Sequence, residues 1–226
     1  MYYREPNAVQ FRVALDEIEP AVWRRLVVPW SWHLGQLHLV LQAAFSWWDC
    51  HLHEFRIGGL RDGDPEVEDW GDEGSARSFD ETQVRLLDFG RSPGLTFAYV
   101  YDFGDDWHHT ITVEKLLALE FAPRAAACIE GARARPPEDV GGIGNYERFL
   151  AIMSDHGDPE HLDTKRWCGG HFDPEWFDLA RADKDVRNAL KPGVRRQCTS
   201  QSRNARKRRP DAVEGGYRPS LPAGLA

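Results

Sequence analysis

With 226 residues, 42% of them hydrophobic, the chain is long enough to bury a substantial core, which excludes a chain that is disordered throughout. Its charge is uneven: the segment from Pro192 to Ala226 carries eight basic and two acidic side chains, which leaves 20 basic and 34 acidic ones before it. That earlier part, with a net charge of −14, disfavours contact with a phosphate backbone, so we expect nucleic-acid binding only from the tail or a local patch.

No apolar run approaches the length of a membrane span, and the first residues lack the apolar core of a signal peptide. The four cysteines are scattered without a C-x-x-C pair, which is typical of reduced thiols in a cytoplasm. We therefore expect a cytoplasmic protein without membrane contact.

The N-terminal quarter predicts a hairpin followed by a helix. Apolar residues alternate from Val9 to Leu15, and a β-branched run follows from Val22 to Val28. Ser31 is suited to cap a helix, because its hydroxyl accepts a backbone N–H that has no partner within the helix. The apolar face of that helix repeats every three or four residues, at Leu34, Leu37, Leu41, Ala44, Phe45 and Trp48.

The rest of the chain alternates strands with turns before it becomes helical. A strand is predicted over 51–57, a short helix over 81–87, and two hairpin strands over 95–101 and 107–113. Residues 136–142, with two prolines and two glycines, predict a shaped loop. Three helix starts are predicted at Asn145, Asp158 and Asp173, with Pro174 at the first helical position of the last.

This order favours an α+β fold over repeated βαβ units. We expect an antiparallel sheet of several hairpin strands, one amphipathic helix near the N-terminus and a helical C-terminal part. The domain is predicted to span 7–191, followed by a basic disordered tail over 192–226.

The first polar block is Asp49-Cys50-His51-Leu52-His53. On a strand, His51 and His53 would share one face, a spacing that metal sites use. The alternative is that one histidine is buried and hydrogen-bonded while the other is solvated.

The second block runs from Tyr101 to His109 and contains three carboxylates and two histidines around a turn. Asp102, Asp105 and His109 could bind a cation or supply acid–base groups. Turn formation alone accounts for Gly104 and one aspartate, and it accounts less well for Trp107.

Two further blocks and the tail complete the candidates. Asp139 lies in the Pro137–Gly141 loop. It either forms a rigidly held carboxylate pair with Glu138 or accepts backbone N–H groups that hold the loop in shape. Cys168 and His171 precede the predicted Asp173 cap. In the tail, Arg206, Lys207, Arg208 and Arg209 are candidates for phosphate contacts or a solvated charge run.

Together these blocks resemble the plasmid pRi ORF-three-like family. The resemblance rests on Ile18-x-Pro20-x-Val22-Trp23-Arg24, the block 51–55, the block 101–109, the loop 136–142 with Gly142, and 169–178. It implies an α+β domain carried on mobile elements, some of whose members are labelled transposon resolvase. Relatives often have cysteines where this chain has Arg135 and Val140, which favours a histidine and carboxylate site over a thiolate site here.

Three functions fit this pattern. The first is a non-catalytic module that binds a protein or small ligand through a His/Asp cleft, since no complete catalytic signature is present. The second is a metal-dependent, phosphodiesterase-like hydrolase, with a divalent metal held by His51, His53, Asp102, Asp105, His109 and Asp139. The third is a DNA-associated accessory factor of a transposon acting through the tail.

Overall fold

The computed structural model describes residues 4–63 and 78–192. From residue 193 onward the predicted disordered tail, including Arg206, Lys207, Arg208 and Arg209, lies outside these residues. Within them, no helix is both long and apolar enough to cross a membrane.

One eight-stranded sheet organises the described residues, with the strand order β5-β4-β3-β6-β7-β1-β2-β8. All neighbours are antiparallel except β4 and β5, which pair in parallel. The strands are β1 (Ala8–Leu15), β2 (Trp23–Pro29), β3 (His53–Ile57), β4 (Leu60–Gly63), β5 (Ser78–Asp80), β6 (Thr96–Tyr101), β7 (Trp107–Leu117) and β8 (Ala127–Ala132). With the helices described below, this arrangement confirms the α+β prediction and both predicted hairpins, β1–β2 and β6–β7.

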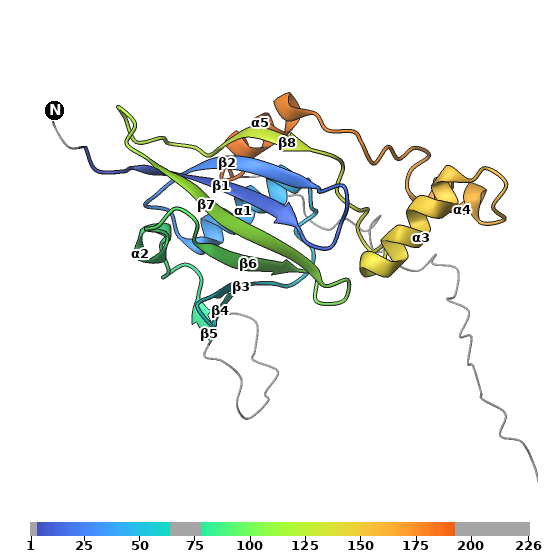
Figure 1. Cartoon of the computed structure of the whole chain (residues 1–226), viewed down its shortest axis with the longest axis horizontal. Coiled ribbons are helices and arrows are strands. Elements are labelled where there is room, and N and C mark those ends of the chain that lie inside the picture. The colour runs from blue at the N-terminus through green and yellow to red at the C-terminus, as the bar shows by residue number, and fades with distance from the viewer. Residues whose placement is uncertain (1–3, 64–77, 193–226) are drawn as a thin grey trace, which may run out of the picture.

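The two faces of the sheet differ in polarity because side chains alternate along each strand. Val9, Phe11 and Val13 of β1 are fully buried on one face, which α1 (Leu34–Phe45) and α5 (Leu179–Asn188) cover, as Figure 1 shows. On the other face Arg25 of β2 forms an ion pair with Glu114 of β7 at 2.7 Å. The core therefore lies between the sheet and its helices, and the opposite face is polar.

Helix α1 forms as its periodicity predicts, but its ends differ from the prediction. His33, rather than Ser31, is the N-cap: its ring accepts the Gln36 N–H, and the Gln36 side chain accepts the His33 N–H in return. The helix ends at Ser46 in a left-handed conformation, so Trp48 lies beyond it. The turn after α1 thereby places residues 47–52 at the end of the sheet.

The remaining helices are α2 (Leu86–Phe89), α3 (Gly142–Ser154), α4 (His161–Trp167) and α5. The prediction of a helix starting at Asp173 and Pro174 was wrong, because Asp173 closes a turn by accepting the Glu175 N–H and Asp178 caps α5 instead. Helix α3 starts at Gly142, three residues before Asn145, with Gly141 as N-cap.

Candidate functional site

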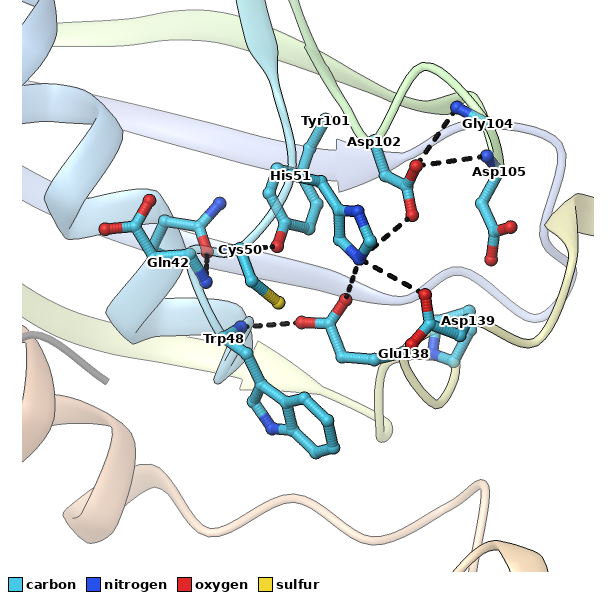
Figure 2. A network of polar contacts seen from close by, with 12 residues as sticks. Gln42, Trp48, Cys50, His51, Tyr101, Asp102, Gly104, Asp105, Glu138 and Asp139 are labelled. Atoms are coloured by element: carbon cyan, nitrogen blue, oxygen red, sulfur yellow. Dashed lines mark hydrogen bonds and ion pairs between the residues drawn. The ribbon is translucent and has the colours of Figure 1, made fainter. Parts of the chain in front are cut away.

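Three segments far apart in the sequence meet at one end of the sheet (Figure 2). They are the turn before β3, the β6–β7 hairpin turn and the loop between β8 and α3. The Asp102 N–H donates to Leu52 O at 2.9 Å and the Gly141 N–H to Asp105 Oδ2 at 2.8 Å. A third bond, from the Trp48 N–H to Glu138 Oε1 at 2.6 Å, ties the loop to the turn after α1.

These segments bring His51, Asp102, Glu138 and Asp139 together, and we call this group the His51 centre. His51 Nε2 lies 3.3 Å from Asp139 Oδ1, 3.4 Å from Asp102 Oδ2 and 3.9 Å from Glu138 Oε2. Three carboxylates therefore converge on one imidazole nitrogen, as Figure 2 shows.

Glu138 has the most unusual environment of the four. Its side chain is 1% exposed, and its Oε2 atom has no hydrogen-bond donor. The nearest guanidinium, that of Arg135, lies 4.0 Å from the other oxygen, Oε1. A buried carboxylate oxygen without a donor is costly, so this atom calls for a partner that is a cation or a hydrogen-bond donor.

Charge and burial act against each other in the centre. Burial lowers the pKa of His51, but the hydrogen bond to Asp139 and the charges of Asp102, Asp139 and Glu138 outweigh it, so the pKa is raised. Burial raises the pKa of Glu138, although Arg135, the Trp48 N–H and His51 partly offset this effect.

The backbone holds two of the carboxylates in an uncommon conformation. Asp102 and Asp139 have φ angles of 59° and 58°, in the left-handed region. Asp102 Oδ1 accepts the N–H groups of Gly104 and Asp105 at 3.0 and 3.3 Å, which leaves Oδ2 toward His51. Such conformations concentrate at functional sites, where the surrounding structure enforces them.

The geometry of the centre suits a metal ion. Ligands about 2.0–2.2 Å from a tetrahedral ion lie roughly 3.3–3.6 Å from one another, close to the separations that His51 Nε2 makes with Asp102 and Asp139. Donor atoms of these three residues all lie within 4.8 Å of one another, and those of Cys50, His51 and Glu138 form a second such group. His51 is the member common to both groups.

Three predicted members of the cluster lie outside the centre, namely His53, His109 and Asp105, and the first two belong to other buried networks. Strand β3 begins at His53, so His51 precedes it and the two imidazoles do not share a site. His109 is fully buried: Trp47 Nε1 donates to its Nε2, and its Nδ1 lies 3.1 Å from the Trp107 carbonyl. Burial lowers the pKa of His109 to about 3, so this ring is neutral and structural.

His53 belongs to a second buried network that the sequence did not indicate. Its ring stacks on His38 with centroids 3.5 Å apart, and its Nε2 lies 2.9 Å from Glu81. His38 in turn lies 2.9 Å from both Asp49 and the Tyr99 hydroxyl. Both nitrogens of His38 are thus engaged, and the network links α1 to β3 and β6.

The predicted structural residues support the loops around the centre. Asp105, predicted as a ligand, holds the loop through the Gly141 N–H, and a Cβ at Gly142 would lie 2.9 Å from Asp105 O. Trp107 is buried and stacks on Trp47. Trp23 lies on β2 beneath the guanidinium groups of Arg12 and Arg25, and Gly104 lies in the β6–β7 hairpin turn. Pro137 and Asp173 line the cavity described below, and the Pro174 carbonyl accepts the Ala134 N–H.

A cavity of about 550 Å³ lies next to the centre and shares two of its residues, Glu138 and Asp139. Its wall comes from the end of α1, the loop before α3, the end of α4, the segment 171–178 and the start of α5. Aromatic rings dominate the lining, namely Phe45, Trp48, Trp167, Phe172, Trp176 and Phe177. A cavity of this size and composition is typical of small-molecule sites.

The fold is α+β, and the family model for plasmid pRiA4b ORF-3-like protein matches residues 7–181, a range that includes the four residues of the His51 centre. The chain belongs to this family. It is 39% identical over 182 residues to the uncharacterized protein y4hQ of Sinorhizobium fredii (strain NBRC 101917 / NGR234), covering 80% of this chain and 91% of that protein. It is also similar to the crystal structure of a protein of unknown function, MM3350, from Methanosarcina mazei Go1, with 32% identity, a TM-score of 0.67, and coverage of 82% of this chain and 99% of that one.

Proposed function

We propose that this chain binds one divalent transition-metal ion at the His51 centre and acts as a metal-dependent module that binds a small ligand. The observation that carries the proposal is the buried Glu138 Oε2, which lacks a donor and lies 3.9 Å from an imidazole that two more carboxylates approach. We assign His51, Asp102 and Asp139 as the metal ligands. Glu138 then accepts a hydrogen bond from a water molecule in the fourth coordination position.

Charge balance supports a divalent ion rather than a proton. With a protonated His51, the three carboxylates still leave a net charge of −2 in a largely buried group. With a neutral imidazole and a divalent ion, the net charge falls to −1. The neighbouring Arg135 adds +1 in either state, which leaves −1 with the proton and zero with the ion. Uncompensated buried charge is expensive, so the metal-bound form is favoured.

The ligand types narrow the choice of ion. Calcium and magnesium prefer all-oxygen sites, whereas imidazole with carboxylates suits zinc, manganese or iron. Three protein ligands also leave a coordination position open, as in catalytic zinc sites.

Calorimetric titration of zinc into the metal-stripped chain tests the proposal. We expect one site per chain and a loss of affinity of about a hundredfold or more in His51→Ala and Asp139→Asn, because loss of an outer partner alone already costs about 10- to 100-fold. The matched control is His53→Ala, a histidine two residues away that lies outside the centre. Absence of binding, or equal affinity in His51→Ala, would refute the proposal.

A metal-dependent hydrolase is the second candidate, because the cavity borders the same carboxylates as the open coordination position. Turnover of a phosphodiester or carboxylic ester by the zinc-loaded chain, absent in Asp139→Asn, would select it. Zinc binding without turnover would favour the binding module.

A further inference from the structure

The Cys50 thiol completes a second group of metal-ligand atoms with His51 and Glu138. One donor atom from each of the three residues lies within 4.8 Å of the other two. In Figure 2 the Cys50 sulfur points toward the Glu138 carboxylate. Neighbouring side chains on a strand would point to opposite faces, but Cys50 and His51 lie in a bend before β3, where Asp49 has a φ angle of 52°. Two adjacent residues therefore both face Glu138.

Glu138 is the member of this group that calls for a direct bond to an ion. Its side chain is 1% exposed, and its Oε2 atom has no hydrogen-bond donor. Oε2 lies 3.9 Å from His51 Nε2, a longer separation than the 3.3 and 3.4 Å to Asp139 and Asp102. At a tetrahedral ion, 3.9 Å between two ligands corresponds to bonds of about 2.4 Å, which are longer than those of zinc to nitrogen and oxygen. The two aspartates thus fit zinc, and Glu138 fits a larger ion.

The sulfur of Cys50 adds a preference for ion type to this preference for ion size. Thiolate is a soft ligand that selects soft ions, whereas carboxylate and water suit harder ones. Asp102 and Asp139 supply only oxygen, so the sulfur distinguishes the Cys50 side of the centre from their side. A divalent ion that is both larger and softer than zinc, cadmium above all, meets both requirements.

We infer that Cys50, His51 and Glu138 form a second ion position, for a soft divalent ion of the cadmium type, in which Glu138 Oε2 is a direct ligand. On binding, the Cys50 thiol gives its proton to solvent, because the thiolate is the form that ligates. This position shares His51 with the proposed zinc position, so the centre holds one ion at a time. The type of ion then decides whether Glu138 binds it directly or through water.

Titration of cadmium chloride into the reduced, metal-stripped chain tests the second position, because a cadmium–thiolate bond gives an ultraviolet charge-transfer band. We expect the band to saturate at one cadmium per chain and to be absent in Cys50→Ser. The matched control is Cys168→Ser, which removes another partly buried thiol, one that lies against Lys165 O at 3.3 Å and outside the centre. This control should keep the full band.

Two carboxylate variants separate the two ion positions. Glu138→Gln should weaken cadmium binding at least about tenfold, because loss of an outer partner alone already costs about 10- to 100-fold. Asp139→Asn, which should lose zinc, should keep the band and change the cadmium affinity by less than about tenfold. Excess zinc should lower the apparent cadmium affinity of the wild-type chain, since both ions need His51. Circular dichroism checks that each variant is folded.

The outcomes distinguish the two positions. No thiolate band in the wild-type chain, a full band in folded Cys50→Ser, or unchanged cadmium affinity in Glu138→Gln would overturn the second position and leave the zinc proposal standing. A thiolate band that depends on Cys50 and Glu138, in a chain that binds no zinc, would support the second position and overturn the proposed function alone.

Discussion

Replacing Glu138 with glutamine is expected to stabilise the metal-free chain. Glutamine has the same shape and keeps the acceptor for the Trp48 N–H, which is bonded to Oε1 at 2.6 Å. The substitution removes a buried carboxylate oxygen that has no donor, and it adds an amide donor that faces carboxylates. An unsatisfied buried polar group costs about 1–3 kcal/mol, so we expect a gain of about 1–2 kcal/mol.

Zinc should change this comparison. At a free zinc concentration about a hundred times Kd, the wild-type chain gains about 2.7 kcal/mol of stability from binding. Loss of the hydrogen bond to the metal-bound water weakens binding about 10- to 100-fold, so the Glu138→Gln variant gains only about 0.4–1.4 kcal/mol under the same conditions. Its advantage over the wild type should therefore shrink by about 1.3–2.3 kcal/mol.

Urea denaturation with and without zinc measures both effects, and melting temperatures should follow at about 2–4 °C per kcal/mol. The control is Glu147→Gln, which removes a carboxylate from the exposed face of α3. A Glu138→Gln variant less stable than the wild type without metal, or equal stabilisation of both proteins by zinc, would contradict the role assigned to Glu138.

Three further predictions test the surrounding structure. His53→Ala should destabilise the chain by about 1–3 kcal/mol in urea without loss of zinc, whereas His51→Ala should lose zinc; the opposite pattern would contradict the site assignment. The pKa of His109 in the folded chain, about 3, lies below its value in the unfolded chain, so the contribution of His109 to the free energy of unfolding is fully present at neutral pH. That contribution should fall by about 1.4 kcal/mol per pH unit as the pH drops below about 6.5, and ring NMR showing a charged His109 at pH 6 would contradict this prediction. Gly142→Ala should cost about 1–3 kcal/mol, because φ is 77° and the new Cβ would lie 2.9 Å from a carbonyl oxygen; Gly144→Ala in the same helix, with open space around it, should be neutral or stabilising in the same denaturation assay.

The periodic elements were predictable from the sequence because their burial follows local spacing. The alternation in β1 and the three- and four-residue spacing in α1 recur in the structure with buried faces. Strand β8 was missed because its central residues, Ile129 and Glu130, are exposed at the edge of the sheet and give no apolar alternation. Asp173 and Pro174 imitate a helix start, yet their roles are a local turn and a carbonyl that accepts the Ala134 N–H.

The candidate site was predictable only in part. His51, Asp102 and Asp139 were named from their blocks, and the structure brings them together. His51 and His53 contribute to different networks because β3 begins at His53 and His51 lies in the preceding turn. The alternation of apolar residues does not define where the strand begins. Glu138 was outside the predicted cluster because its missing hydrogen-bond donor is a property of the assembled loops, not of the sequence around it.

The most direct test of the metal centre is anomalous diffraction at the zinc edge from crystals of the zinc-loaded chain. We expect one strong peak within about 2.0–2.2 Å of His51 Nε2 and of oxygens from Asp102 and Asp139, with Glu138 Oε2 next to a coordinated water. A fully occupied zinc at another position, with His51 still hydrogen-bonded to Asp139, would contradict it.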